Sequence, residues 1–199
     1  MRVGVLGGTF DPIHMGHVEV AKAAMECARL DRVLFVPSAQ PPHRAAAEAS
    51  AEDRLAMSRL AVDGDSRLEV SDVEVKRGGK SYTVDTLQEL HRSLPDDELF
   101  LILGWDAARL FRTWHQPEGV SALASFVIVG RPGMPPPKQA DLKLAGLDPD
   151  RVVVCLLPTP DISGSELRRA IAAGISVAGK LAPAVERYIA VHHVYGDNR

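Results

Sequence analysis

Short apolar runs recur along the chain, separated by longer stretches in which apolar and polar residues follow a helical period. Each run holds four to six residues and ends at or just before glycine, proline or serine. Runs of this kind are typical of strands in a parallel sheet that helices cover on both faces. We therefore predict strands at Val3–Leu6, Arg32–Pro37, Leu99–Gly104, Ser125–Val129 and Val152–Leu157, and another at Leu68–Val75, where apolar and polar residues alternate.

The stretches between these runs predict amphipathic helices. From about Gly16 to Leu30, Val18 and Met25 fall on an apolar face and Glu19 falls on the opposite, charged face. Further helices are predicted at 50–62, which begins with a Ser-Ala-Glu-Asp capping box, and at 84–93, 163–173 and 183–192. Strands alternating with helices predict a single-domain, doubly wound, Rossmann-like α/β fold of five or six mainly parallel strands. Its ligand site is expected at the carboxyl ends of the strands.

The composition is ordinary for a globular protein of 199 residues, with 46% hydrophobic and 25% charged residues. The formal net charge of -3 excludes a surface that binds polyanions generally, so nucleic acid is not an expected partner. No apolar run approaches the roughly 18 residues of a membrane span, and the first predicted strand leaves no room for a signal peptide. We therefore expect no membrane association and a cytoplasmic location.

The two cysteines lie in a predicted helix and a predicted strand. Cys27 and Cys155 have apolar neighbours and lack the spacing of a metal or redox motif. We therefore predict that both are small buried hydrophobic side chains.

The segment between the first predicted strand and its helix carries the clearest chemistry. Gly7 and Gly8 have no Cβ, so a phosphate can approach their backbone closely. The first N–H groups of the following helix have no partner within the helix and attract anions. His14 and His17 can offer hydrogen bonds or positive charge to phosphate oxygens. This segment therefore predicts a site that handles phosphate groups.

Other interpretations of the histidine pair fit this segment less well. Taken alone, His-x-x-His is more often structural, and it can also be half of a metal site, but no third ligand lies nearby in the sequence. The glycines at positions 4, 7 and 8 do not form the dinucleotide-binding G-x-G-x-x-G pattern. The segment also lacks the Lys-Ser/Thr of a P-loop.

Two motifs resemble those of a known superfamily. Residues 8–12, Gly-Thr-Phe-Asp-Pro, and residues 14–17, His-Met-Gly-His, are similar to the signature of the nucleotidyltransferases that share His-x-Gly-His with class I aminoacyl-tRNA synthetases. Residues 162–168, Ile-Ser-Gly-Ser-Glu-Leu-Arg, resemble the second signature, Ile-Ser-x-Ser/Thr-x-x-Arg. Because both motifs occur in this order, about 150 residues apart, the whole chain resembles the bacterial nicotinate mononucleotide adenylyltransferases.

The resemblance implies transfer of the adenylyl group of ATP to nicotinate mononucleotide, with Mg²⁺, giving deamido-NAD and pyrophosphate. It assigns catalysis to His14, His17 and Arg168, and it names no residue as a metal ligand. It places ATP against Gly7, Gly8, Thr9, Phe10, His17, Gly104, Asp106, Ile162, Ser163, Ser165 and Arg168. It places nicotinate mononucleotide against Arg44, Thr83, Trp114, His115 and Arg131.

The sequence departs from the family pattern at three places. Arg44 stands where a lysine is usual, Trp105 replaces a small residue, and Gly164-Ser165 replaces a Ser-Thr pair. Arg44 keeps the charge but changes the geometry of the contact. We expect Ser165 to keep the hydroxyl that matters most and Trp105 to reshape the pocket.

Several alternatives stay open at the level of sequence. Without the resemblance, Trp114 would be expected in the core, Thr83 would be a helix cap, and residues 41–44 would be a rigid surface turn. Two other functions also remain: phosphopantetheine adenylyltransferase, whose first motif is similar, and a non-catalytic nucleotide-binding module of the same fold. The sequence does not fix the oligomeric state and leaves a homo-oligomer open.

Overall fold

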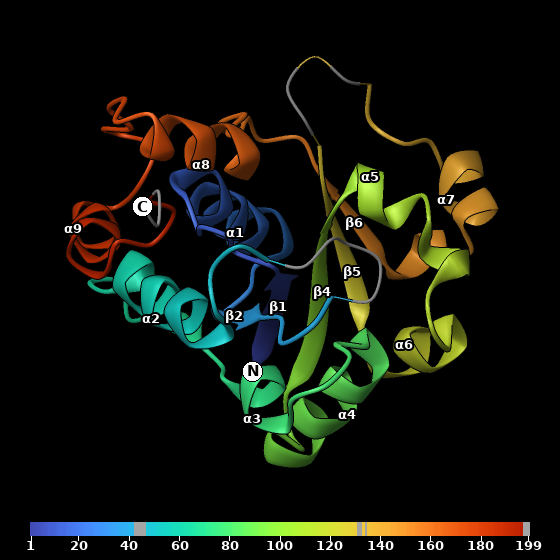
Figure 1. The fold of residues 1–199 in the computed structure, drawn as a ribbon. Coiled ribbons are helices and arrows are strands. Elements are labelled where there is room, and N and C mark those ends of the chain that lie inside the picture. The colour runs from blue at the N-terminus through green and yellow to red at the C-terminus, as the bar shows by residue number, and fades with distance from the viewer. Residues whose placement is uncertain (42–46, 131–132, 134, 197–199) are drawn as a thin grey trace.

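A parallel sheet of six strands forms the centre of the molecule (Figure 1). The structure is a computed structural model, and it describes residues 1–41, 47–130, 133 and 135–196. Each strand pairs with its neighbours in parallel. The strands are β1 (Arg2–Gly8), β2 (Arg32–Pro37), β3 (Leu68–Val70), β4 (Glu98–Gly104), β5 (Ser125–Val129) and β6 (Val152–Cys155).

The strands lie in the order β3-β2-β1-β4-β5-β6. From β1 the chain adds strands toward one edge of the sheet and from β4 toward the other edge, so the order reverses between β1 and β4, although all strands are parallel. In such sheets ligands bind at the carboxyl ends of the strands that flank the reversal. At that point β1 ends in Gly7 and Gly8, and β4 ends in Gly104. The topology therefore brings two of the predicted site segments, about 100 residues apart in the sequence, to neighbouring strand ends.

Helices cover both faces of the sheet (Figure 1), as the sequence predicts. One layer contains α1 (Met15–Ala28), α2 (Ala51–Val62), α8 (Gly164–Ala172) and α9 (Pro183–His192). The other contains α3 (Val73–Arg77), α4 (Thr83–Ser93), α5 (Trp105–Ala108), α6 (Pro117–Leu123) and α7 (Gln139–Ala145), with the 3-10 turns η1 (Phe111–Thr113) and η2 (Pro149–Arg151). Each layer packs its own apolar core against the sheet. None of the helices in the described part of the chain is long and apolar enough to span a membrane.

The predicted strand at Leu68–Val75 is partly wrong. Only β3 is extended, and it pairs with β2 alone at the edge of the sheet. Residues 73–77 form α3 instead, where the buried side chain of Glu74 accepts a hydrogen bond from the hydroxyl of Thr86 at 2.5 Å. This tertiary contact, together with the Asp72–Lys76 ion pair at 3.1 Å, overrides the alternating pattern.

The prediction of two separate buried cysteines is also wrong, because Cys27 and Cys155 form a disulfide. Their Cα atoms are 5.6 Å apart, although the residues are 128 positions apart in the sequence. Only the packing of α1 against β6 brings them together, so neither spacing nor composition signals the bond. The disulfide ties the helix that follows the first motif to the strand that precedes the second.

Candidate active site

The turn after β1 leaves room for a ligand at one glycine and not at the other. A Cβ at Gly7 would meet no described residue within 4 Å, so the backbone there is open. A Cβ at Gly8 would lie 2.6 Å from the ring of Phe10. Phe10 is buried and has a left-handed backbone, with φ 51°, which turns the chain after the strand. Gly7 therefore suits a close phosphate, whereas Gly8 makes space for the Phe10 ring.

The two histidines of the first motif lie face to face at the start of α1. Their ring centroids are 3.7 Å apart, and the His17 ring meets the Phe10 ring edge-on at 5.0 Å. The backbone N–H of His14 donates a hydrogen bond to Nδ1 of His17 at 3.3 Å. Because Nδ1 accepts this bond, the neutral His17 ring carries its hydrogen on Nε2.

Burial decides the charge of His14. Its side chain is 7% exposed, and the loss of solvation lowers its pKa from 6.5 to about 4. Its Nδ1 atom is buried and has no hydrogen-bond partner within the described residues. Of the two contributions predicted for His14, hydrogen bonding and positive charge, burial favours the first at neutral pH.

The second motif lies directly against the first. Nη1 of Arg168, on α8, donates a hydrogen bond to the backbone oxygen of Asp11 at 2.7 Å. A Cβ at Gly164 would lie 3.3 Å from that same oxygen, and a Cβ at Gly16 would lie 3.2 Å from the backbone oxygen of Pro160. Glycine at position 164 therefore allows the start of α8 to approach the backbone of the first motif closely. We call the contacting segments 7–17 and 162–168 the motif junction.

The carboxylate of Asp11 connects the motif junction to two other segments. It is buried, and it accepts hydrogen bonds from the backbone N–H of Glu48 at 2.9 Å and of Ala49 at 3.1 Å. The hydroxyl of Tyr195 donates a third, at 2.7 Å. Oδ2 of Asp11 also lies 3.7 Å from Nη1 of Arg168. The sequence does not indicate these roles of Asp11 and Tyr195, because no pattern links residues 184 positions apart.

Arg54 of α2 is a third residue whose role the sequence does not indicate. Its side chain is 1% exposed, and it donates to the backbone oxygens of Thr9 at 2.7 Å, Ala39 at 3.2 Å and Ala49 at 3.3 Å. Burial lowers the pKa of its guanidinium, and the negative charge of Asp11 opposes that shift. These bonds hold the turn after β1 against the end of β2.

The remaining residues predicted to bind ATP lie at the ends of β4 and β6. A Cβ at Gly104 would meet no described residue within 4 Å. Asp106, on α5, is half-exposed and lies 3.7 Å from Nε of Arg109. Trp105 packs against the core of the α4 layer, and this packing accommodates the large indole that stands where the family has a small residue.

At the start of α8, the hydroxyl oxygens of Ser163 and Ser165 are 2.9 Å apart, and Ile162 packs against the core.

The structure groups three of the residues predicted to contact nicotinate mononucleotide. Thr83 begins α4, and the ring of the preceding Tyr82 lies against the His115 ring, with centroids 4.2 Å apart and the planes tilted by 32°. Trp114 is partly buried and lies 5.6 Å from Phe111. We call Thr83, Trp114 and His115 the ring side. Arg44 and Arg131, also assigned to this substrate, lie outside the described residues.

The described residues hold no cluster of three or more His, Cys, Asp or Glu side chains that could bind a metal. Mg²⁺ commonly binds through substrate phosphates with few protein ligands. A Mg²⁺ ion that enters with ATP would therefore not require such a cluster.

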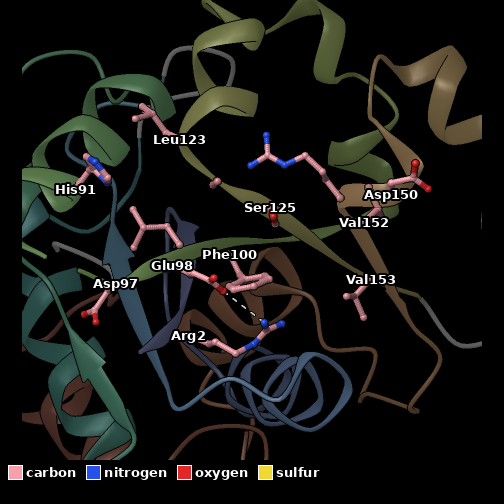
Figure 2. Close-up of a pocket in the computed structure, with 13 residues that line it drawn as sticks. Arg2, His91, Asp97, Glu98, Phe100, Leu123, Ser125, Asp150, Val152 and Val153 are labelled. Carbon is pink, nitrogen blue, oxygen red and sulfur yellow. Dashed lines mark hydrogen bonds and ion pairs between the residues drawn. The ribbon is translucent and has the colours of Figure 1, made fainter. Parts of the chain in front are cut away.

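A cavity of about 430 Å³ lies at the opposite, amino end of the strands (Figure 2). The guanidinium of Arg2 lies 4.3 Å from the centre of the Phe100 ring and 3.4 Å from the carboxylate of Glu98. Arg151 donates a hydrogen bond to the backbone oxygen of Ser121. The two arginines that line this cavity are thus already partnered, and none of the predicted site residues lines the cavity.

Comparison with known proteins identifies the family. The cytidylyltransferase-like family model matches residues 5–170. A Thermus thermophilus protein named "Probable nicotinate-nucleotide adenylyltransferase" is 47% identical over 98% of this chain and 100% of its own. A Synechococcus protein of the same name is 39% identical over 98% of this chain and 95% of its own. This chain belongs to the nicotinate-nucleotide adenylyltransferase family.

Solved structures agree on the fold of this adenylyltransferase family member. Plasmodium falciparum nicotinic acid mononucleotide adenylyltransferase, complexed with NaAD, superposes with a TM-score of 0.77 over 98% of this chain and 97% of its own. A Vibrio parahaemolyticus protein described as a "Putative Nicotinate-nucleotide Adenylyltransferase" superposes with a TM-score of 0.68 over 99% of this chain and 97% of its own. The sequences are only 18% and 17% identical to this chain, so these likenesses concern the Rossmann-like architecture.

Proposed function

We propose that the chain transfers the adenylyl group of ATP to nicotinate mononucleotide, giving deamido-NAD and pyrophosphate. The supporting observation is the motif junction, where the 2.7 Å bond from Arg168 to Asp11 brings both motifs together. Membership of the nicotinate-nucleotide adenylyltransferase family supports the choice of substrates.

The reaction requires alignment and charge neutralisation more than acid–base chemistry. A phosphate oxygen of nicotinate mononucleotide forms a bond to the α-phosphorus of ATP. The bond from that phosphorus to the bridging oxygen breaks, and pyrophosphate leaves with the electron pair. Because the attacking oxygen is already anionic near neutral pH, no general base is needed.

The motif junction supplies groups suited to the α-phosphate. Arg168 carries a permanent positive charge, and the neutral His14 and its stacked partner His17 offer ring N–H groups. The first N–H groups of α8 can also bind an anion, whereas at the start of α1 the N–H of Met15 already donates to the backbone oxygen of Lys180 at 2.8 Å. Mg²⁺ bound to the ATP phosphates would neutralise further negative charge. Gly7, Thr9 and Phe10 would border the phosphates, with Gly104 and Asp106 on the adenosine side.

The ring side is suited to the pyridine of nicotinate mononucleotide. Trp114 offers a face for stacking, and the first N–H groups of α4, near Thr83, can bind the ring carboxylate. We also propose that Arg44 and Arg131 contact this substrate, and that the protein acts in the cytoplasm.

Pyrophosphate release tests the assignment. Purified protein with ATP and Mg²⁺ is offered nicotinate mononucleotide, nicotinamide mononucleotide or phosphopantetheine in separate reactions, and the dinucleotide product is identified by chromatography. We expect rapid release with nicotinate mononucleotide. Release with phosphopantetheine alone would reassign the substrate, and release with none of the three by folded protein would indicate a non-catalytic module.

A further inference from the structure

The C-terminal segment after α9 reaches back to the first motif. His193 and Tyr195 both have left-handed backbones, with φ 52° and 67°, and this turns the chain at the end of the helix. Such conformations are unfavourable for residues other than glycine, so the surrounding contacts must hold them. Tyr195 packs against the core of the α1 layer, and its hydroxyl donates to Oδ1 of Asp11 at 2.7 Å.

Tyr195 is a dependable hydrogen-bond donor. Burial and the neighbouring Asp11 carboxylate raise the pKa of its phenol, so the hydroxyl keeps its proton at neutral pH. A hydrogen bond to a charged acceptor is stronger than one between neutral groups. The contact therefore offsets part of the charge of a buried carboxylate.

Asp11 in turn sets both contacts of the Arg168 guanidinium. Nη1 of Arg168 is bound to the backbone oxygen of Asp11, and Nε is bound to Oε1 of Glu48 at 2.5 Å. Glu48 is itself held through its backbone N–H by Oδ2 of Asp11. A shift of the Asp11 side chain would therefore release the backbone of Glu48, the partner of Nε, and would change the distance from Oδ2 to Nη1 of Arg168.

We propose that Tyr195 is a positioning residue for the nucleotide site, holding Asp11 so that Arg168 remains directed at the phosphates of ATP. Without the phenol, the Asp11 carboxylate loses one of the three hydrogen bonds that described residues donate to it. Among those residues Arg168, 3.7 Å from Oδ2, is the nearest cation that can replace the lost bond. The guanidinium is then drawn toward Asp11. The inference rests on the proposed function, because it takes ATP as the ligand of Arg168.

The chain provides a matched control. On α9, the hydroxyl of Tyr188 donates to Oδ1 of Asp53 at 2.8 Å, which is the same kind of bond made outside the motif junction. Figure 1 shows α9 beside α2, the helix that carries Asp53. Tyr195→Phe and Tyr188→Phe each remove one hydroxyl and keep the ring, so both variants should fold.

The test measures binding of a non-hydrolysable ATP analogue with Mg²⁺ by calorimetry, together with steady-state kinetics. Tyr195→Phe should raise the Kd of the analogue and the KM of ATP about 5- to 20-fold, because a bond to a charged group is lost. The KM of nicotinate mononucleotide should change less than about twofold, as should every constant of Tyr188→Phe. Equal behaviour of the two variants would overturn the proposal.

A second measurement asks whether the effect passes through Arg168. In an Arg168→Lys background, Tyr195→Phe should weaken analogue binding less than about twofold, since the planar guanidinium is already absent. An undiminished effect there would contradict the positioning role. The binding assay contains no acceptor, so wild-type protein that binds the analogue but makes no deamido-NAD would refute the proposed substrate and leave the result for Tyr195 intact.

Discussion

At the motif junction, Asp11 and Arg168 make hydrogen bonds between charged groups and backbone, and Arg54 of α2 donates to the junction at the backbone oxygen of Thr9. On the ring side, Trp114 and His115 are held mainly by aromatic packing against Phe111 and Tyr82. The first arrangement fixes donors before any ligand binds, which is what electrostatic stabilisation of a transition state requires. The second presents flat surfaces and helix N–H groups, which suit recognition of a substrate. We therefore expect loss of the junction histidine His17 to alter mainly kcat, loss of the contacts of Arg168 to alter mainly ATP binding, and changes on the ring side to alter the KM of nicotinate mononucleotide.

The largest expected effect concerns substrate choice on the ring side. Nicotinate carries a carboxylate that only accepts hydrogen bonds, whereas nicotinamide replaces one acceptor with an NH₂ donor. If the N–H groups near Thr83 and His115 converge on this substituent, the amide leaves donors unpaired, and discrimination should be roughly 10² to 10⁴-fold. Values of kcat/KM for the two mononucleotides measure it. If the two kcat/KM values agreed within about threefold, the ring side would not discriminate between the carboxylate and the amide.

His17→Ala should have the next largest effect, at the motif junction. By analogy with the loss of one oxyanion-hole donor, kcat should fall roughly 10² to 10³-fold, about 2.7 to 4 kcal/mol, with little change in KM. His91→Ala is the control, because His91 lines the cavity at the other end of the sheet. A near-normal kcat for His17→Ala would leave that histidine with a structural role only.

His14 should make the protein less stable in acid. Its pKa is lowered by burial from 6.5 to about 4, so between these values the unfolded chain binds a proton that the folded chain does not. The free energy of unfolding should therefore be unaffected by this residue above about pH 7. It should fall as the pH drops toward 4, by about 3 kcal/mol in total. Urea titrations of wild type and His14→Gln at several pH values measure this loss of stability. If the free energy of unfolding fell with pH equally in both proteins, the prediction would be contradicted.

The disulfide should stabilise the side of the molecule that carries the motif junction. Reduction frees a loop of 128 residues and should lower the free energy of unfolding by about 2 to 4 kcal/mol. Thermal melts of oxidised and reduced wild type should differ, while a Cys27→Ser/Cys155→Ser variant should not respond to reductant. Identical melts for oxidised and reduced wild type would show that the bond adds no stability.

The elements most predictable from the sequence are those in which one local pattern dominates. The bounds of β2, β5 and α9 match the predicted ranges. A short continuous apolar run predicts a buried strand, and an amphipathic stretch that begins with proline predicts a helix. Both motifs could likewise be located by their residues, and the structure brings them into contact. The helix at 73–77, the disulfide and the bond from Tyr195 to Asp11 could not be predicted, since each depends on partners supplied by the tertiary fold.

For residues within the two regions compared, the smallest effect is expected for Trp114→Ala. Loss of stacking on the pyridine should raise the KM of nicotinate mononucleotide about 5- to 30-fold, while kcat and most of the preference for the acid remain. Trp114→Phe keeps an aromatic face and should recover most of the affinity. If Trp114→Ala alone abolished the preference for the acid, the indole and not the N–H groups would determine selectivity.

The division between the two regions is tested most directly by the double variant His17→Ala/Trp114→Ala in steady-state kinetics. If the junction acts on the transition state and the ring side on substrate binding, the double variant should have the kcat of His17→Ala and the KM of Trp114→Ala. Its loss in kcat/KM should equal the sum of the single losses within about 0.5 kcal/mol. A Trp114→Ala enzyme that loses as much kcat as His17→Ala, or a coupling above about 1 kcal/mol, would contradict the division.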